Sequence, residues 1–460
     1  HPTHRMRALF LLAALCALPL ITHAVTIKDF SMPSMEAGSL QGNYTAYYFN
    51  QQLDHTVNGS ATWQQKYFLD VSAYKPGGPI FFFLGGEAPL EFFTYELPQI
   101  GETVNLAHEF GGAFVGLEHR FYGNMPVKGG MLTVDNLKYL SVEQALADAA
   151  AFREFIAKKL ASDVVVVTGV SYSGALAAYA RLKYPSLYVA AYASSGVVEA
   201  ILDFVEYGQQ SAADVTSDCR LRIYDGIQTI DDIMGIPDSG TRLQELFNPC
   251  GNVTVENPVP FLYTLGGDLI GPAQEAQESE TVCPFFQDGD NLVNMVNFFH
   301  NGTPYAECVP IFEVASLQDT NPANNAVGGR QWFWQKCTQW GFFKDAAPIG
   351  ASFEPQWINL TMHYDLCEEI FGEAMQPDVD AFNAKYEGKN TTVTKVVFIN
   401  GGEDPWHHCS ILESNSAQDI VAFVTPGVGH GRETLPPSPN DPPAVIKARQ
   451  VIHDAIASWL

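Results

Sequence analysis

One serine of this sequence stands where its hydroxyl could act as a nucleophile. Ser171 lies within Gly169-Val-Ser-Tyr-Ser-Gly174, directly after a short apolar run and before a stretch with helical spacing. A serine on such a sharp strand-to-helix turn is held above the sheet with its hydroxyl exposed. Gly169 supplies the small residue that the turn needs before the serine, whereas Ser173 replaces the glycine that is usual after it. We predict that Ser171 is a catalytic nucleophile rather than a helix cap.

A serine hydroxyl needs a base, and the base needs an acid that orients it. On this kind of turn the acid and then the histidine follow the serine along the chain, each on a loop after a late strand. Asp404 and His430 each follow a late apolar run. Glu403 is an alternative acid, and His407 and His408 are alternative bases that share the loop of Asp404. We predict Asp404 and His430, because only this pair uses two separate loops.

The elements around these residues alternate between strand and helix. Continuous apolar runs predict buried strands of a parallel sheet at 79–84, 113–117, 164–168, 396–400 and 420–424. Apolar residues at helical spacing predict helices at 142–160, 175–183 and 443–460. Ser141 and Gln144 have the spacing of a capping box at the first of these helices. The alternation predicts an α/β sheet.

Residues 196–389 interrupt this alternation with long helical stretches and turns. Six of the eight cysteines lie between Cys219 and Cys367, and such clustering in a secreted chain suggests disulfides. Zinc is the rival interpretation, but the chain has no Cys-X-X-Cys pair. We predict an α/β-hydrolase fold formed by residues 25–195 and 390–460, with residues 196–389 as a helical, disulfide-bonded cap insertion. Neither a metal nor another cofactor is expected.

The N-terminus has the pattern of a signal peptide. Arg5 and Arg7 precede the apolar run 8–21, and small residues follow it, so we expect cleavage after Ala24 and a signal peptide at 1–24. The run is short for a membrane span, and no later run reaches about 20 apolar residues, so no membrane anchor is expected. N-linked glycans are expected because the chain has Asn-X-Ser/Thr sequons at Asn43, Asn58, Asn252, Asn301, Asn359 and Asn390.

The 460-residue chain is strongly acidic, with 25 Lys and Arg against 51 Asp and Glu. Nucleic acid is not expected as a partner of such a chain, because phosphate binding needs basic surface. Repulsion among the carboxylates relaxes as they protonate, which favours an acidic working medium. We expect a protein that is secreted or delivered to an acidic vacuole-like or lysosome-like compartment.

Several motifs together resemble the prolyl carboxypeptidase and dipeptidyl peptidase II family of serine peptidases. The string around Ser171 is similar to that family's Gly-Gly-Ser-Tyr-small-Gly sequence, with Val170 in place of a glycine. The resemblance spans about residues 45 to 460 and continues, in the family's order, through Gly85-Gly-Glu87, Glu118-His-Arg-Phe-Tyr-Gly123, Arg330-Gln-Trp-Phe-Trp-Gln-Lys-Cys337 and Asp404-Pro-Trp406.

This resemblance implies a capped α/β-hydrolase that cleaves peptides beside proline, with Ser171, Asp404 and His430 as its triad. Trp406 matches a pocket wall for the substrate proline, which a flat apolar ring suits. Glu87 is assigned to substrate binding. The resemblance also implies the pairs Cys219–Cys283, Cys250–Cys308 and Cys337–Cys367, which leaves Cys409 over.

The backbone N–H groups of Tyr172, at a helix N-terminus, and of Gly86, on a loop after an early strand, are the expected oxyanion hole. The chain departs from the family's pattern at Ala175, where some members have methionine, and at Gly431-Arg432-Glu433 after the base.

The function predicted from these residues is a serine peptidase that hydrolyses bonds next to proline through an acyl-enzyme, with peptides containing proline as substrates. The residues leave open whether it reads a free terminus. An esterase or lipase with the same turn is one alternative. A secreted binding glycoprotein that has lost catalysis is another.

Overall fold

A computed structural model describes residues 45–460 except 97–98, 128, 252, 254–256 and 302. The predicted signal peptide and the sequons at Asn43 and Asn252 lie outside the described residues. None of the described helices is long and apolar enough to cross a membrane.

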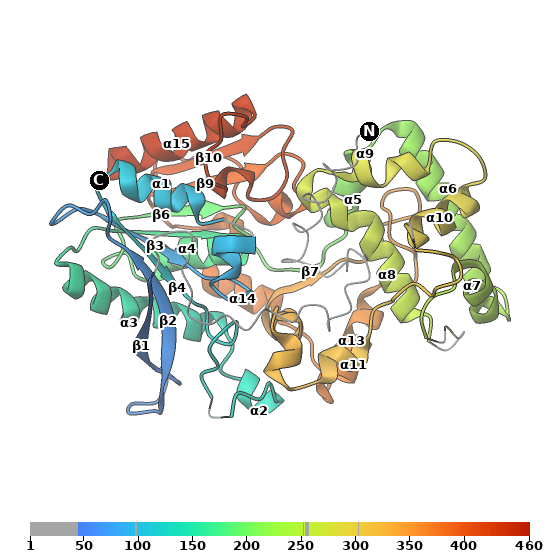
Figure 1. The fold of residues 1–460 in the computed structure, drawn as a ribbon, viewed down its shortest axis with the longest axis horizontal. Coiled ribbons are helices and arrows are strands. Elements are labelled where there is room, and N and C mark those ends of the chain that lie inside the picture. Colours follow the sequence, from blue (N-terminus) through green and yellow to red (C-terminus); the bar gives the residue numbers. More distant parts are fainter. Residues whose placement is uncertain (1–44, 97–98, 128, 252, 254–256, 302) are drawn as a thin grey trace.

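An eight-stranded sheet forms the core of one half of the molecule (Figure 1), with the strand order β1-β2-β4-β3-β5-β6-β9-β10. The strands from β4 to β10 in this order are parallel, and β2 pairs antiparallel with both β1 and β4. The bounds of these strands are Thr45–Gln52 (β1), Thr62–Asp70 (β2), Ile80–Leu84 (β3), Ala113–Leu117 (β4), Val165–Val170 (β5), Ala190–Ser194 (β6), Val396–Gly401 (β9) and Ile420–Thr425 (β10).

Helices cover both faces of this sheet, as the alternation of apolar side chains along each strand requires. Phe82 and Val167 face the layer that contains α3 and α4, whereas Phe81 and Val166 face the layer that contains α1 and α15. The bounds of these helices are Gly101–Glu109 (α1), Val142–Leu160 (α3), Tyr172–Lys183 (α4) and Pro443–Trp459 (α15).

Most of the chain between β6 and β9 forms the second, largely helical half (right side of Figure 1), whereas α14 (Val379–Tyr386), near the end of this stretch, lies beside the sheet half. Two short parallel strands, β7 (Ile201–Asp203) and β8 (Gly341–Phe343), pair within this stretch. The helices of the stretch are Glu206–Ala213 (α5), Ser217–Met234 (α6), Ser239–Phe247 (α7), Val259–Ile270 (α8), Gly271–Glu275 (η2), Glu278–Thr281 (α9), Cys283–Phe285 (η3), Asn291–His300 (α10), Val314–Gln318 (α11), Pro322–Asn325 (η4), Gly329–Gln335 (α12), Lys336–Trp340 (η5), Leu360–Phe371 (α13), Val379–Tyr386 (α14) and Gly388–Asn390 (η6).

The remaining helical turns lie in loops of the sheet half. They are Phe92–Glu96 (η1), Val134–Leu137 (α2), Pro405–Cys409 (η7) and Arg432–Thr434 (η8). This sheet topology with a helical insertion confirms the predicted α/β-hydrolase fold with a cap. The boundaries chosen for the two parts, 195/196 and 389/390, stay a prediction.

Three disulfides crosslink the described part of the cap, and all three pairings expected from the resemblance are confirmed. They join Cys219 to Cys283, Cys250 to Cys308, and Cys337 to Cys367. Each closes a loop of 30 to 64 residues, a length for which a crosslink commonly contributes about 3 kcal/mol or more. Cys409 is a buried free cysteine.

One local prediction is corrected, and one pair of strands was missed. The Ser141 side chain accepts from the N–H of Gln144 and caps α3, but Gln144 does not reach back. Its amide instead accepts from His55 N and donates to Asp54 Oδ1, so only half of the predicted capping box forms. The antiparallel pair β1–β2 was not predicted, because β1 is mostly exposed and lacks a continuous apolar run.

Candidate active site

Ser171 stands at the turn between β5 and α4 in a backbone conformation that few non-glycine residues adopt. Its φ is 60° and its ψ is −127°, and such strain persists only where the surroundings enforce it. The N–H of Ser171 donates to Ser194 O of the neighbouring strand β6 at 2.9 Å. The predicted helix 175–183 in fact begins at Tyr172, directly after the serine. The tight strand-to-helix turn predicted from the sequence is therefore present.

The close packing around this turn explains why small residues occupy its sequence. A Cβ on Gly169 would lie 2.1 Å from the backbone oxygen of Ser173, and one on Gly174 would lie 2.6 Å from Ser194 O. Ser173 fits because its hydroxyl turns back onto the chain, accepting from Val170 N at 3.0 Å and donating to Val170 O at 2.9 Å. The serine in place of the usual glycine thus adds hydrogen bonds to the turn.

Gly169→Ala is expected to destabilise the protein strongly, because the added methyl group meets backbone that cannot swing away. We expect a loss of about 3 kcal/mol or more in the free energy of unfolding, typical of a substitution that forces core backbone to move. Gly235→Ala is the matched control, since its Cβ would have one neighbour, at 3.3 Å. Denaturant unfolding of both variants checks this, and equal losses would contradict it.

Asp404 and His430 lie on the loops after β9 and β10 and contact each other. His430 Nδ1 is 2.7 Å from Asp404 Oδ2, and both side chains are buried. The second oxygen, Asp404 Oδ1, accepts from Trp406 N at 2.9 Å. Nδ1 therefore donates to the carboxylate, which leaves Nε2 as the nitrogen that can take a proton from a serine. Of the two adjacent acids, Asp404 rather than Glu403 contacts His430.

The loop of His430 packs against the turn of Ser171. A Cβ on Gly431 would lie 2.8 Å from Val170 Cγ2, in the residue before the serine. Gly431 N donates to Ser195 Oγ at 3.0 Å, beside the carbonyl that holds the serine backbone. From the cap, Gln274 O accepts from His430 N at 2.7 Å. The three distant stretches of chain thus meet at one place.

Glu433 has buried contacts beside the loop of His430 that the sequence pattern did not reveal. It is buried, and its Oε1 accepts from Ser194 Oγ at 2.6 Å and from Tyr192 OH at 3.0 Å. Burial raises the pKa of this carboxyl, against the hydrogen bonds from Ser194 and Tyr192. Both partners lie on β6, so Glu433 ties the base loop to the middle of the sheet. The residue first noted as a departure from the family pattern is a structural anchor.

Charges around His430 change its pKa. Burial alone would lower the pKa of His430, but Asp404, followed by Glu275 and Glu87, outweighs burial, and the pKa is raised above its usual 6.5. A base must be neutral to accept a proton, so kcat/KM is expected to fall about tenfold per pH unit below this raised pKa. The acidic limb of a pH–rate profile should therefore lie above pH 6.5.

This direction opposes the acidic optimum expected from the net charge. Glu275 reduces the contrast, because burial raises its own pKa to about 7, so below that pH it protonates and no longer raises the pKa of His430. A profile of kcat/KM from about pH 4 to about pH 9 separates the two expectations. Full activity near pH 5 would contradict the influence assigned to the carboxylates around His430.

The two groups predicted to stabilise an oxyanion border the same turn. Tyr172 is the first residue of α4, where helix N–H groups have no partner within the helix. A Cβ on Gly86 would lie 3.7 Å from Ser173 Cβ, which places the 85–87 loop beside the turn. Glu87 is buried, and its charge acts on both His430 and Tyr172. The roles of Tyr172, Gly86 and Glu87 stay predictions.

Trp406 lies in an aromatic cluster between the acid loop and the cap. Its ring centroid is 5.1 to 5.4 Å from those of Phe204, Tyr207 and Phe342, and Nε1 donates to Gln274 Oε1 at 3.0 Å. Only 1% of the residue is exposed. In this structure its ring is enclosed by protein, so its role as a wall for a substrate proline stays a prediction.

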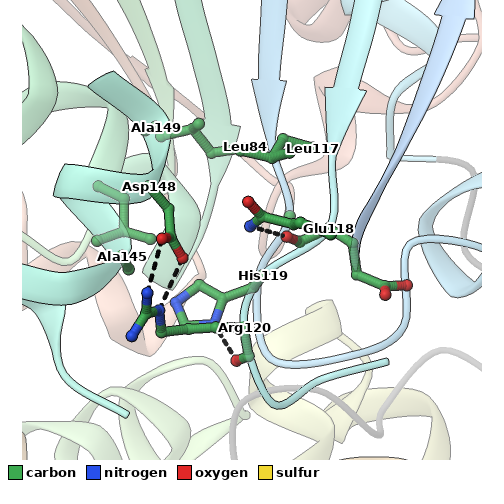
Figure 2. A pocket seen from close by; sticks show the side chains of 11 residues that line it. Leu84, Leu117, Glu118, His119, Arg120, Ala145, Asp148 and Ala149 are labelled. Carbon is green, nitrogen blue, oxygen red and sulfur yellow. Dashed lines mark hydrogen bonds and ion pairs between the residues drawn. The ribbon is translucent and has the colours of Figure 1, made fainter. Parts of the chain in front are cut away.

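The charged residues of the 118–123 motif are all satisfied within the protein. Glu118 forms an ion pair with Lys66 at 2.8 Å and accepts from Asn124 N at 2.7 Å. Arg120 is fully buried and holds both oxygens of Asp148, at 2.6 and 2.7 Å (Figure 2). The cavity drawn in Figure 2 has a volume of about 20 Å³, room for about one water molecule. The charged side chains of this motif therefore connect it to the neighbouring loops and to α3.

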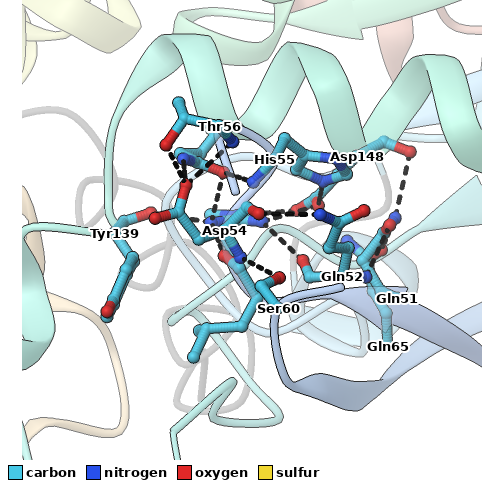
Figure 3. A network of polar contacts seen from close by, with 12 residues as sticks. Gln51, Gln52, Asp54, His55, Thr56, Ser60, Gln65, Tyr139 and Asp148 are labelled. Atoms are coloured by element: carbon cyan, nitrogen blue, oxygen red, sulfur yellow. Dashed lines mark hydrogen bonds and ion pairs between the residues drawn. The ribbon is translucent and has the colours of Figure 1, made fainter. Parts of the chain in front are cut away.

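Asp148 of α3 also contacts the end of β1 and the turn that follows it (Figure 3). His55 Nε2 lies 2.7 Å from Asp148 Oδ1, and Gln51 donates to Asp148 O at 3.1 Å. Two further histidines also have partners inside the protein. His363 lies 3.1 Å from Asp345, and His119 lies 2.9 Å from the hydroxyl of Tyr172.

The chain matches the family described as serine carboxypeptidase S28 over residues 51–452. It is 31% identical over 446 residues to "Probable serine protease EDA2" of Arabidopsis thaliana, which covers 90% of this chain and 88% of the relative. It is 32% identical over 457 residues to "Putative serine protease K12H4.7" of Caenorhabditis elegans, covering 91% and 88%.

A third relative, "Lysosomal Pro-X carboxypeptidase" of Bos taurus, is 26% identical over 459 residues, covering 91% of this chain and 88% of the relative. The match extends over the turn of Ser171, the cap and both late loops alike. This chain belongs to the S28 family of serine peptidases.

Proposed function

We propose that this protein hydrolyses peptide bonds next to proline, with Ser171 as nucleophile, His430 as base and Asp404 as the orienting acid. The observation that carries the proposal is the 2.7 Å contact between His430 Nδ1 and Asp404, on loops packed against the strained turn of Ser171. The serine oxygen attacks the peptide carbonyl carbon while its proton passes to His430 Nε2. The imidazolium then protonates the leaving nitrogen, and water hydrolyses the acyl-enzyme by the reverse roles.

The preference for proline rests on a relative and on a group of aromatic rings. The relative named Lysosomal Pro-X carboxypeptidase acts, by its name, on bonds after proline. The aromatic rings of Trp406, Phe204 and Tyr207 lie on the cap side of the acid loop. The flat apolar face of an aromatic ring suits a pyrrolidine ring, so we place the proline-binding pocket there. The cluster is enclosed in this structure, so it must open to admit a proline.

Secretion, or delivery to a lysosome-like compartment, is part of the proposal. Three disulfides support an oxidising folding environment. The sequon residues Asn58, Asn359 and Asn390 are exposed, as acceptors of N-linked glycans must be.

A substrate panel tests the proposed specificity. An Ala-Pro-reporter amide, a peptide ending in Pro-Phe and an internally quenched peptide with blocked termini distinguish cleavage after an N-terminal dipeptide, C-terminal cleavage and internal cleavage. Each is paired with a control that has alanine in place of proline. We expect cleavage of at least one, with about tenfold or greater preference for proline, the scale that a hydrophobic pocket can supply. Hydrolysis of simple esters without hydrolysis of any of the peptides would favour an esterase and contradict the proposal.

A further inference from the structure

The side chain of Tyr172, the residue after the proposed nucleophile, is fully enclosed between the sheet half and the cap. Its hydroxyl lies 2.9 Å from His119 Nε2 on the sheet side and 2.9 Å from Gln335 Nε2 on the cap side. Its ring packs against two cap tryptophans, Trp332 at 5.8 Å and Trp340 at 5.7 Å between ring centroids. The cap therefore holds the first residue of α4 by a hydrogen bond and two ring contacts.

The donor and the acceptor can be assigned in each hydrogen bond around the Tyr172 hydroxyl. His119 Nδ1 lies 2.7 Å from Arg120 O, which can only accept, so Nδ1 carries the proton and Nε2 accepts from Tyr172 OH. The oxygen of Tyr172 then accepts from Gln335 Nε2. Tyr122 OH donates to Gln335 Oε1 at 2.5 Å. The amide of Gln335 therefore donates to Tyr172 and accepts from Tyr122 at the same time.

Gln335 sits where the cap helix changes its winding. It is the last residue of α12, and the π-helical turn η5 follows at once. Such turns are rare and often occur at functional sites. The next residue but one, Cys337, is joined to Cys367 of α13. This geometry fixes the amide of Gln335 relative to the rest of the cap.

We propose that Gln335 is a positioning residue, which holds Tyr172 so that its backbone N–H faces the developing oxyanion. The inference rests on the proposed catalytic role of Ser171. Tyr172 follows the strained serine directly, so a shift of its buried ring moves the N–H of the same residue. The hydroxyl, the ring and the backbone N–H of Tyr172 belong to one rigid residue at the start of α4. The position of the cap, which holds the hydroxyl and the ring, therefore determines where this N–H points in the oxyanion hole.

The test compares two amides of α12, Gln335→Leu and Gln331→Leu. Gln331 is also buried, and it donates to Phe121 O of the sheet half at 3.1 Å. The amide that donates to Tyr172 is that of Gln335 instead. We expect Gln335→Leu to lower kcat about 10- to 100-fold with KM within about twofold, as for a displaced oxyanion donor. Gln331→Leu should lose similar thermal stability but keep kcat within about threefold.

Two further variants keep the test decisive if Gln335→Leu does not fold. Gln335→Met keeps the length of the side chain but has no group that can donate to Tyr172, so it should lose kcat as Gln335→Leu does. Tyr172→Phe keeps the ring and the backbone N–H but loses both hydrogen bonds, and it should lower kcat to a similar extent. A normal kcat in either variant, or equal losses in Gln335→Leu and Gln331→Leu, would overturn the inference. Failure of the proposed function itself is seen separately, as activity retained in Ser171→Ala.

Discussion

Ser171→Ala is expected to lower kcat about 10⁶-fold, to the residual rate that binding and the oxyanion donors alone supply. The variant keeps the turn, because the structural hydrogen bond there joins the backbone N–H of residue 171 to Ser194 O. The loss should therefore come without a comparable loss of stability. Kinetics on the best substrate of the panel, with thermal melting in parallel, measures both effects.

The matched control for this variant is Ser173→Gly, which removes the second hydroxyl of the same turn. That hydroxyl bonds to Val170 N and O, and glycine is the residue expected there from the general pattern. We expect its kcat to stay within about tenfold of the wild type. Activity that survives Ser171→Ala but disappears in Ser173→Gly would move the nucleophile to residue 173.

Asp404→Asn is expected to lower kcat about 10⁴-fold while the fold is kept. The reason lies in the two contacts of this carboxylate. Trp406 N donates to Oδ1, so the oxygen of an asparagine must stay on that side and its NH₂ group must face His430 Nδ1. The imidazole then carries its proton on Nε2 and cannot accept one from the serine. Steady-state kinetics of the variant checks the size of the loss.

Glu403→Gln is the matched comparison for Asp404→Asn. It changes the adjacent carboxylate, whose backbone N–H donates to Val428 O while its side chain is not the one that contacts His430. We expect a change in kcat of less than about tenfold. A collapse of activity in Glu403→Gln, with Asp404→Asn unaffected, would assign the orienting acid to Glu403 instead.

Most strands that could be predicted from the sequence are buried on both faces, although the partly exposed edge strand β10 was also predicted and the buried strand β6 was not. Val165–Val170 and Val396–Gly401 are central strands, so their apolar runs are continuous and easy to recognise. The edge strand β1 has mostly exposed residues, so its sequence carries no comparable signal. The predicted helix 443–460 agrees with α15 at its first residue and nearly so at its last, since one face of this helix is regularly apolar.

The candidate site divides in the same way. Ser171, Asp404 and His430 could be proposed because each follows a recognisable strand. Gln335 and Glu433 could not, because their partners lie 163 and 239 residues away and only folding brings them together. Trp406 could be singled out from the sequence, but its role could not be decided. An aromatic residue in a motif looks the same in the sequence whether it lines a pocket or packs in a core.

Mapping the adduct of a fluorophosphonate tests the central claim most directly. The reagent reacts with a serine oxygen only where a base removes its proton and the charge that develops is stabilised. The wild-type protein is labelled, digested and examined by mass spectrometry for the modified peptide. We predict one adduct, on Ser171, absent from Ser171→Ala and formed far more slowly in Asp404→Asn. An adduct on another residue, or none while peptides are still hydrolysed, would contradict the assignment of the nucleophile.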